Sequence, residues 1–181
     1  MPELPKILQR RFSTRKHKVE TLALEFSNGV QREYFRMHPS GLGAVMVVAM
    51  PDPQSVLLTR EYCCGFHRYE LGIPRGRLDP GETPLIAADR ELKEEAGFGA
   101  KQLTYLRTLS LAPTYMAHEI HVVLARDLYP ERLEGDEPEL LEVLPWPLAE
   151  LEALSLREDF TEGRALAALL VARAFLAQEA Q

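Results

Sequence analysis

Hydrophobic and polar positions change their spacing several times along this chain of 181 residues, and each spacing predicts a different element. On both sides of Asn28-Gly29, apolar and polar residues alternate, which predicts a β-hairpin over residues 18–38. Residues 43–50, GAVMVVAM, are almost continuously apolar, as is typical of a strand buried on both faces. After a turn at residues 51–53, residues 55–60 predict the next strand.

A helical period follows these strands. Between residues 84 and 96 the apolar positions are spaced by three, four and four residues, which predicts one buried helix face made of Leu85, Ala88, Leu92 and Ala96. Thr83 followed by Pro84 suits an N-cap and a first helical position. Gly97 is expected to end the helix in the left-handed conformation.

The second half of the chain continues with strands and ends with helices. Residues 101–112 and 119–126 predict two strands, and residues 140–146 predict a shorter one. Helices are expected over residues 147–154 and 159–177. Strands and helices mixed in this order predict an α+β domain.

Composition limits the class of protein further. A chain of this length with 46% hydrophobic residues can bury a sizeable core and is not disordered. The net charge of −6 argues against nonspecific binding to nucleic acid, which needs a basic surface. We therefore expect one globular domain with small-molecule partners and no nucleic-acid partner.

Cysteine usage and the amino-terminal segment indicate the compartment. The two cysteines, Cys63 and Cys64, are adjacent and face opposite sides of a strand, so they form no disulfide framework. Residues 1–18 are basic but lack the apolar segment of a secretory signal. The apolar run over residues 165–172 is too short to span a membrane. These features predict a soluble, cytoplasmic protein without a membrane partner.

Three carboxylates crowd the predicted helix and carry the candidate chemistry. Glu91, Glu94 and Glu95 stand at i, i+3 and i+4, which places them on one helix face. Like charges at this spacing repel each other by about 0.3 kcal/mol per pair. Such a run is either an ordinary solvated face or a site for a hard divalent cation, and Mg²⁺ in particular binds carboxylates together with substrate phosphates.

The surrounding spacing favours the metal site. Residues 76–98 follow the pattern G-x5-E-x7-R-E-apolar-x-E-E-x-G-apolar, which resembles the Nudix box at every defining position. The resemblance implies a Nudix fold, an α+β arrangement in which a mixed β-sheet is sandwiched between helices (α/β/α). It also implies hydrolysis of a nucleoside diphosphate linked to another moiety, with Mg²⁺ or Mn²⁺ as cofactor.

A wider similarity extends over most of the chain. The sequence is similar to the ADP compounds hydrolase subgroup of this family at LEFSNGV (24–30), REY (60–62), ELKEEAGFGA (91–100), LAPTY (111–115) and DLYPERLEGDEPE (127–139). This similarity implies cleavage of ADP-ribose, NADH and short diadenosine polyphosphates with release of AMP. It also implies a homodimer, in which residues 1–40 form a dimerising β-sheet extension of a Nudix domain over residues 41–181.

The resemblance assigns roles to individual residues. The implied metal ligands are Glu91, Glu94, Glu95 and the backbone carbonyl of Arg75, which precedes the box glycine. The implied catalytic residues are Glu94, Glu95, Glu137 and Glu139; either of the last two, or a box glutamate, would take the proton of the attacking water. Gly76, Glu82 and Arg90 would support the ligands, with Arg90 donating to the glutamates and to Glu82.

Five residues are candidates for substrate contact: Arg36, Arg60, Glu70, Tyr115 and Glu119. Arg60 either binds substrate phosphates or makes a surface salt bridge. Glu70 either recognises substrate or fixes the loop before the box, and Tyr115 either stacks on adenine or caps the core. Glu137 and Glu139 are likewise either site residues or part of a solvated loop.

Two rival functions are compatible with the box alone. One is a hydrolase that removes unwanted nucleoside triphosphates, against which the amino-terminal sheet, Pro113 and the acidic loop argue. The other is a noncatalytic module that senses nucleotides. Because every box glutamate is present and no basic helix-turn-helix segment is visible, the sequence favours an enzyme.

Overall fold

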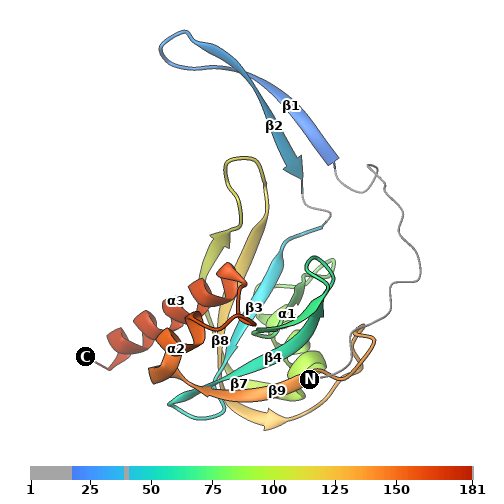
Figure 1. Cartoon of the computed structure of the whole chain (residues 1–181), viewed down its shortest axis with the longest axis vertical. Coiled ribbons are helices and arrows are strands. Elements are labelled where there is room, and N and C mark those ends of the chain that lie inside the picture. The colour runs from blue at the N-terminus through green and yellow to red at the C-terminus, as the bar shows by residue number, and fades with distance from the viewer. Residues whose placement is uncertain (1–17, 39–40, 181) are drawn as a thin grey trace.

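An antiparallel hairpin stands apart from the rest of the molecule (Figure 1). In this computed structural model, which describes residues 18–38 and 41–180, the hairpin consists of β1 (Lys18–Glu25) and β2 (Gln31–His38). Gly29 takes the positive φ of 77° that the predicted turn requires. The predicted hairpin is therefore confirmed, whereas most of the segment in which we expect no secretory signal lies outside the described residues.

Two further sheets form the body of the molecule. Their strands are β3 (Ala44–Ala49), β4 (Ser55–Cys63), β5 (Arg68–Gly72), β6 (Arg75–Arg77), β7 (Phe98–Ser110), β8 (Glu119–Pro130) and β9 (Glu142–Pro147). The larger sheet has the order β6-β3-β8-β7, and β3 runs parallel to β8 while the other pairs are antiparallel. The smaller sheet has the order β5-β4-β9. The larger sheet is thus mixed, as expected.

Helical segments lie against these sheets (Figure 1). They are α1 (Pro84–Glu91), a π-helical turn η1 (Leu92–Ala96), a 3₁₀ turn η2 (Leu148–Glu150), α2 (Leu151–Ser155) and α3 (Gly163–Glu179). Within the part of the chain that the structure describes, no helix has the length and hydrophobicity of a membrane span.

Strand β3 lies at the centre of the sandwich and buries both of its faces. Val45 and Val47 pack in a cluster with Ala88 and Leu92 of the helix after Thr83. Met46, with its neighbours on the opposite face, packs in a second cluster with residues of α2 and α3. Alternate β3 side chains therefore contact helices on opposite sides, which confirms the predicted α/β/α arrangement.

Several boundaries differ from the prediction, and two of the differences have a clear cause in the contacts of the chain. Strand β4 continues to Cys63, since its second half pairs with β5. The last helix begins at Gly163 and not at Asp159, because the Glu162 side chain accepts hydrogen bonds from the first backbone N–H groups of α3. The partner strand β5 pairs with β4 across a turn, whereas Glu162 is a local cap that directly precedes the helix.

Candidate metal and substrate site

The helix that carries the three box glutamates begins as predicted and changes its geometry where they lie. The Thr83 hydroxyl accepts a hydrogen bond from the backbone N–H of Ile86 at 3.4 Å, and Gly97 ends the helix at φ 76°. The last turn, Leu92–Ala96, is a π-helix and not the α-helix expected from the sequence. A π-turn is wider than an α-turn. Glu94 and Glu95 therefore lie at different angles around the helix axis from those that an α-helix would give.

Two of these glutamates are buried although they carry ionisable groups. Glu95 is only 3% exposed, and its carboxylate accepts a hydrogen bond of 2.9 Å from the backbone N–H of Arg75. Burial, with a smaller contribution from the nearby carboxylates of Glu61 and Glu91, raises the pKa of Glu95 to about 9. Burial also raises the pKa of Glu91 to about 7. Ionising both groups is therefore costly unless a cation balances them.

Arg90 is the centre of the contacts that hold these carboxylates. Its Nη1 lies 2.8 Å from one oxygen of Glu91 and 2.8 Å from one oxygen of Glu94. Its Nε donates to Glu82 at 2.8 Å, and its Nη2 donates to the backbone oxygen of Arg77 at 2.8 Å. The expected contact between Arg90 and Glu82 is thus present, and one guanidinium orients three glutamates.

Gly76 leaves the space that the Glu91 carboxylate occupies. A Cβ atom at position 76 would lie 2.0 Å from the carboxyl carbon of Glu91, a separation that no side chain can tolerate. The close approach of strand β6 to the helix therefore explains why the box begins with glycine.

We expect Gly76→Ala to weaken metal binding by about 10–100-fold, because the added methyl group displaces the Glu91 carboxylate from Arg90. Isothermal titration with Mn²⁺ measures the change. Gly65→Ala, at a turn glycine where an added Cβ meets nothing within 4 Å and the φ is not positive, provides the control for loss of a glycine. An unchanged Mn²⁺ affinity in Gly76→Ala would contradict the placement of Glu91 at the metal site.

The glutamates open into a polar cavity of about 700 Å³. It is lined by Glu61, Arg75, Gly76, Arg77, Asp79, Arg90, Glu91, Glu94, Glu95, Glu134, Gly135, Asp136 and Glu137. The cavity is large enough for a nucleotide-sized ligand. The structure therefore brings together the box residues, the residue before the box and one of the two glutamates of the acidic loop.

The structure places Glu137 and Glu139 differently. Glu137 is half-buried in this cavity, where burial and the charges of Asp136, Glu61 and Glu94 raise its pKa. Glu139 lines an adjoining cavity of about 620 Å³, and its carboxylate accepts a hydrogen bond from the Tyr69 hydroxyl at 2.5 Å. Glu137 is thus the glutamate of this pair that faces the box carboxylates.

The donor set suits a hard divalent cation. Carboxylate and carbonyl oxygens are the ligands that Mg²⁺ and Mn²⁺ prefer, and the burial of Glu91 and Glu95 requires a balancing charge. Across residues 18–38 and 41–180, however, no three acidic, histidine or cysteine side chains converge on one point. The Nη1 of Arg90 lies 2.8 Å from an oxygen of Glu91 and 2.8 Å from an oxygen of Glu94.

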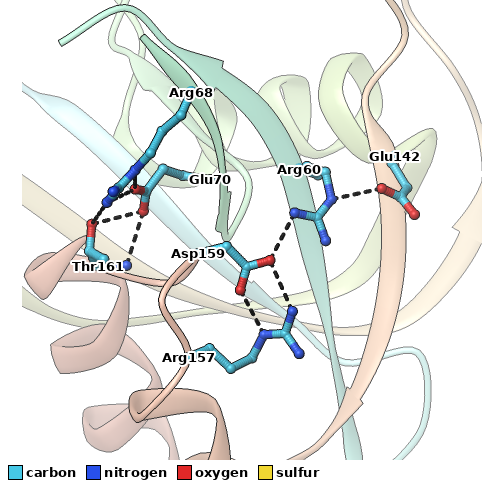
Figure 2. A network of polar contacts seen from close by, with 7 residues as sticks. All are labelled: Arg60, Arg68, Glu70, Glu142, Arg157, Asp159 and Thr161. Atoms are coloured by element: carbon cyan, nitrogen blue, oxygen red, sulfur yellow. Dashed lines mark hydrogen bonds and ion pairs between the residues drawn. The ribbon is translucent and has the colours of Figure 1, made fainter. Parts of the chain in front are cut away.

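Two of the substrate candidates take part in a polar network that ties the sheet to the start of α3 (Figure 2). Arg60, whose side chain is 10% exposed, donates to Glu142 at 2.8 Å and to Asp159 at 2.9 Å. Glu70, 5% exposed, accepts from the hydroxyl of Thr161 at 2.8 Å and from its backbone N–H at 3.1 Å. Neither residue lines the acidic cavity, and the contacts of Glu70 are those of a residue that fixes a loop.

Asp159 gives this network a measurable pH dependence. Hydrogen bonds from Arg157 and from Arg60 together lower the pKa of Asp159 to about 2. The folded pKa lies below the ordinary value of 3.8, so this stabilisation is complete above pH 3.8 and is lost as the pH falls toward 2. We expect Asp159→Asn to reduce the free energy of unfolding by about 2 kcal/mol at pH 7 and by much less at pH 2.

Urea unfolding at both pH values measures this difference. Glu158→Gln, a change at the exposed neighbouring carboxylate, serves as the control and should have an effect within about 0.5 kcal/mol. Equal destabilisation by Asp159→Asn at pH 7 and pH 2 would show that the ion pairs contribute no pH-dependent stability.

The remaining substrate candidates lie outside the cavity lining. Arg36 pairs with Glu20 across the hairpin. Tyr115 is 52% exposed in the loop before β8, and its carbonyl accepts from the backbone N–H of Met37 at 2.8 Å. Glu119 is exposed at the start of β8. Tyr115 and Glu119 therefore lie on the side of the body to which the base of the hairpin is hydrogen-bonded.

Glu61 is a residue of the site that was not predicted from the sequence. This residue lines the cavity, and its carboxylate lies 2.6 Å from the guanidinium of Arg75. The available signal was strand alternation, since neighbouring residues of a strand point to opposite faces. Once Arg60 points toward Asp159, Glu61 must point the other way, toward the box.

A mixed sheet between helices, with buried glutamates on the helix of a G-x5-E-x7-R-E-x2-E-E box, is the arrangement of the Nudix family, and the chain belongs to this family. A model of the NUDIX domain matches residues 41–169. A second model, of the NudE-type Nudix hydrolase N-terminal domain, matches residues 5–36, which include part of the hairpin.

Individual relatives show which members of the Nudix family the chain is similar to. The chain is 51% identical to the ADP compounds hydrolase NudE of Escherichia coli (strain K12) over 158 residues, which cover 87% of this chain and 84% of that protein. It is 35% identical to the ADP-ribose pyrophosphatase of Bacillus subtilis (strain 168) over 143 residues, covering 78% and 74%. A crystal structure of an ADP compounds hydrolase superposes with a TM-score of 0.83 at 47% identity, over 98% of this chain and 96% of that one.

Proposed function

We propose that this protein hydrolyses the diphosphate linkage of ADP-linked compounds and releases AMP. The substrate class comprises ADP-ribose, NADH and short diadenosine polyphosphates. The observation that carries the proposal is the pair of buried glutamates, Glu91 and Glu95, at a cavity of about 700 Å³. The similarity to an ADP compounds hydrolase over most of both chains supports the choice of substrate class.

The charge of the cavity explains why the reaction needs a cation. An anionic diphosphate is repelled by the carboxylates of Glu61, Glu91, Glu94, Glu95 and Glu137, all of which line the same space. We propose that Mg²⁺ or Mn²⁺ is held by Glu91, Glu94, Glu95 and the carbonyl of Arg75. When bound, the cation neutralises the diphosphate and lowers the pKa of a coordinated water.

The chain's own residues then hold the groups in place. The backbone N–H of Arg75 fixes one oxygen of Glu95, and Arg90 orients Glu91 and Glu94. Glu137 faces the same cavity, and burial raises its pKa, which makes its carboxylate a stronger base than a solvated one. We propose Glu137 as the general base that takes the proton of the attacking water.

A product-resolved assay tests this function. ADP-ribose, NADH and diadenosine triphosphate are each incubated with Mg²⁺ or Mn²⁺, and AMP is separated by chromatography. Release of pyrophosphate from nucleoside triphosphates, without AMP from any of these compounds, would favour a triphosphate hydrolase. Tight nucleotide binding without turnover under either metal would favour a sensing module.

We also propose a cytoplasmic homodimer, in which residues 1–40 form the dimerising extension of a Nudix domain over residues 41–181. The hairpin exposes large apolar side chains, including Val19 at 57% and Phe35 at 63%, and a two-stranded hairpin is marginally stable without a covering partner. Light scattering should give twice the chain mass for the protein and a reduced mass for Phe35→Ser. Phe66→Ser, at a phenylalanine 74% exposed outside the hairpin, is the control.

A further inference from the structure

An ion pair joins the two sheets of the body beside the box, next to the chain connection at residues 73–74. Glu61 belongs to β4 in the smaller sheet, and Arg75 begins β6 in the larger sheet. The Nη2 atom of Arg75 lies 2.6 Å from a carboxylate oxygen of Glu61. Both side chains are largely shielded, with exposed fractions of 22% for Arg75 and 31% for Glu61.

Strand β6 is held on one side by the box helix, through Arg90 on the Arg77 carbonyl and the Arg75 N–H on Glu95. It is three residues long and lies at the edge of its sheet, where it pairs only with β3 through the register from Ala44–Arg77 to Met46–Arg75. The adjacent carbonyl of Pro74 accepts one hydrogen bond from Val47 at 2.8 Å. The guanidinium of Arg75 therefore adds a side-chain link to the second sheet, beyond the short chain connection through Ile73 and Pro74.

Glycine at position 72 makes room for this guanidinium. A Cβ atom there would lie 2.9 Å from the Nη1 of Arg75. Glycine is required here for space, because its φ lies outside the left-handed region. Gly72 and Glu61 thus contact the same guanidinium from two different strands.

We propose that the Glu61–Arg75 ion pair is a positioning device for the metal site. Residue 75 contributes two groups to that site through its backbone: the N–H that fixes Glu95, and the carbonyl that we assign as a metal ligand. Holding the guanidinium against Glu61 fixes both groups. This inference rests on the proposed function only where its test uses kinetics. The affinity for Mn²⁺ is measured without any turnover.

Electrostatics alone predicts a different result, which makes the proposal testable. Arg75 is a cation beside a cation site, so removing its charge should strengthen Mn²⁺ binding if charge were its only influence. Removing the negative charge of Glu61 should weaken binding on the same grounds. A positioning role predicts instead that the loss of either partner weakens binding, and that losing both adds little beyond losing one.

The experiment measures Mn²⁺ affinity by electron paramagnetic resonance in the full chain and in Arg75→Met, Glu61→Gln and the double variant. We expect the dissociation constant to rise about 10–100-fold in each single variant, with a strongly nonadditive double variant. Arg75→Lys, which keeps the charge opposite Glu61, should recover most of the affinity. Arg107→Met, at an exposed arginine of β7, controls for the loss of one positive charge.

Gly72→Ala provides a second route if Arg75→Met does not fold. It keeps both charges and displaces only the tip of the guanidinium, so the same weakening of Mn²⁺ binding is expected to a smaller extent. At saturating metal, the KM for ADP-ribose should be unchanged in Gly72→Ala, which alters no charge in the cavity. If the wild-type chain binds Mn²⁺ but cleaves no ADP-linked compound, the proposed function fails while the titration still decides the role of the pair.

Three results would overturn the proposal. Tighter Mn²⁺ binding by Arg75→Met would show that Arg75 influences the metal site only through its positive charge. An increased KM with unchanged Mn²⁺ affinity would make Arg75 a substrate ligand. Weaker binding by Glu61→Gln alone, with Arg75→Met unaffected, would make Glu61 a direct metal ligand.

Discussion

Glu95→Gln should abolish hydrolysis of ADP-ribose and, at the same time, stabilise the metal-free protein. The amide keeps the shape of the side chain and can still accept the hydrogen bond from the backbone N–H of Arg75. It cannot supply an anionic ligand, so we expect kcat with Mg²⁺ to fall by about 10³-fold, which corresponds to about 4 kcal/mol of transition-state stabilisation.

The gain in stability follows from the raised pKa of Glu95. Its folded pKa of about 9 lies above the ordinary value of 4.5, so the wild-type fold is penalised increasingly as the pH rises from 4.5 to 9. The penalty grows by up to about 1.4 kcal/mol per pH unit in this window. In the presence of EDTA, the free energy of unfolding of wild type should therefore fall between pH 5 and pH 9 more steeply than that of Glu95→Gln.

Glu134→Gln is the matched control for this variant. Glu134 lines the same cavity but is exposed, so its replacement should change neither the slope with pH nor kcat by more than about threefold. Activity retained by Glu95→Gln would show that Glu95 is no metal ligand. Lost activity without any gain in metal-free stability would show that its burial carries no electrostatic cost.

The elements that the sequence predicted well are those whose signals are local. The hairpin turn at Asn28-Gly29 and the helix start at Thr83 depend on residues within a few positions of each other. The burial of Leu92 follows from a period that runs along a single helix. Such features survive folding because tertiary contacts reinforce the local preference.

The features that the sequence did not predict depend on segments far apart in the chain. Nothing local distinguishes Arg60 from Glu61 as the residue that faces the box, since strand alternation gives two faces without saying which is which. The structure decides this through Asp159, which pairs with Arg60 from 99 positions away. The later start of the last helix is different, because the Glu162 cap that sets it is local and was simply not recognised in the sequence.

The π-turn is a further case of tertiary control. The period of Leu85, Ala88, Leu92 and Ala96 fits an ordinary α-helix, and nothing in it predicts the wider last turn. Residues Glu91 and Glu95 are nevertheless drawn inward, where Arg90 and the backbone of Arg75 satisfy their oxygens. The candidate site could therefore be located from its motif, whereas its geometry required the contacts of β6.

Glu137→Gln should lower kcat by about 10²–10⁴-fold with little change in KM, because it removes the proposed base and leaves the shape of the cavity. Glu139→Gln should lower kcat by less than tenfold, since the Glu139 carboxylate is engaged by the Tyr69 hydroxyl in the adjoining cavity. Steady-state kinetics with ADP-ribose at saturating Mg²⁺ measures both. Glu137 and Glu139 carry the same charge, lie in the same loop and are two residues apart in the sequence. Each variant is therefore the control for the other.

Gly135→Ala separates a catalytic role of Glu137 from a loss of charge in the loop. A Cβ atom at position 135 would lie 2.4 Å from a carboxylate oxygen of Glu137 and 3.3 Å from the Cβ of Glu94. Because the tip of a flexible side chain can move, the fold should tolerate the methyl group, whereas the Glu137 carboxylate must leave its present position. A base that must sit in this position predicts a loss of kcat in Gly135→Ala that approaches the loss in Glu137→Gln. Full activity of Gly135→Ala together with a large loss in Glu139→Gln would reassign the base to Glu139.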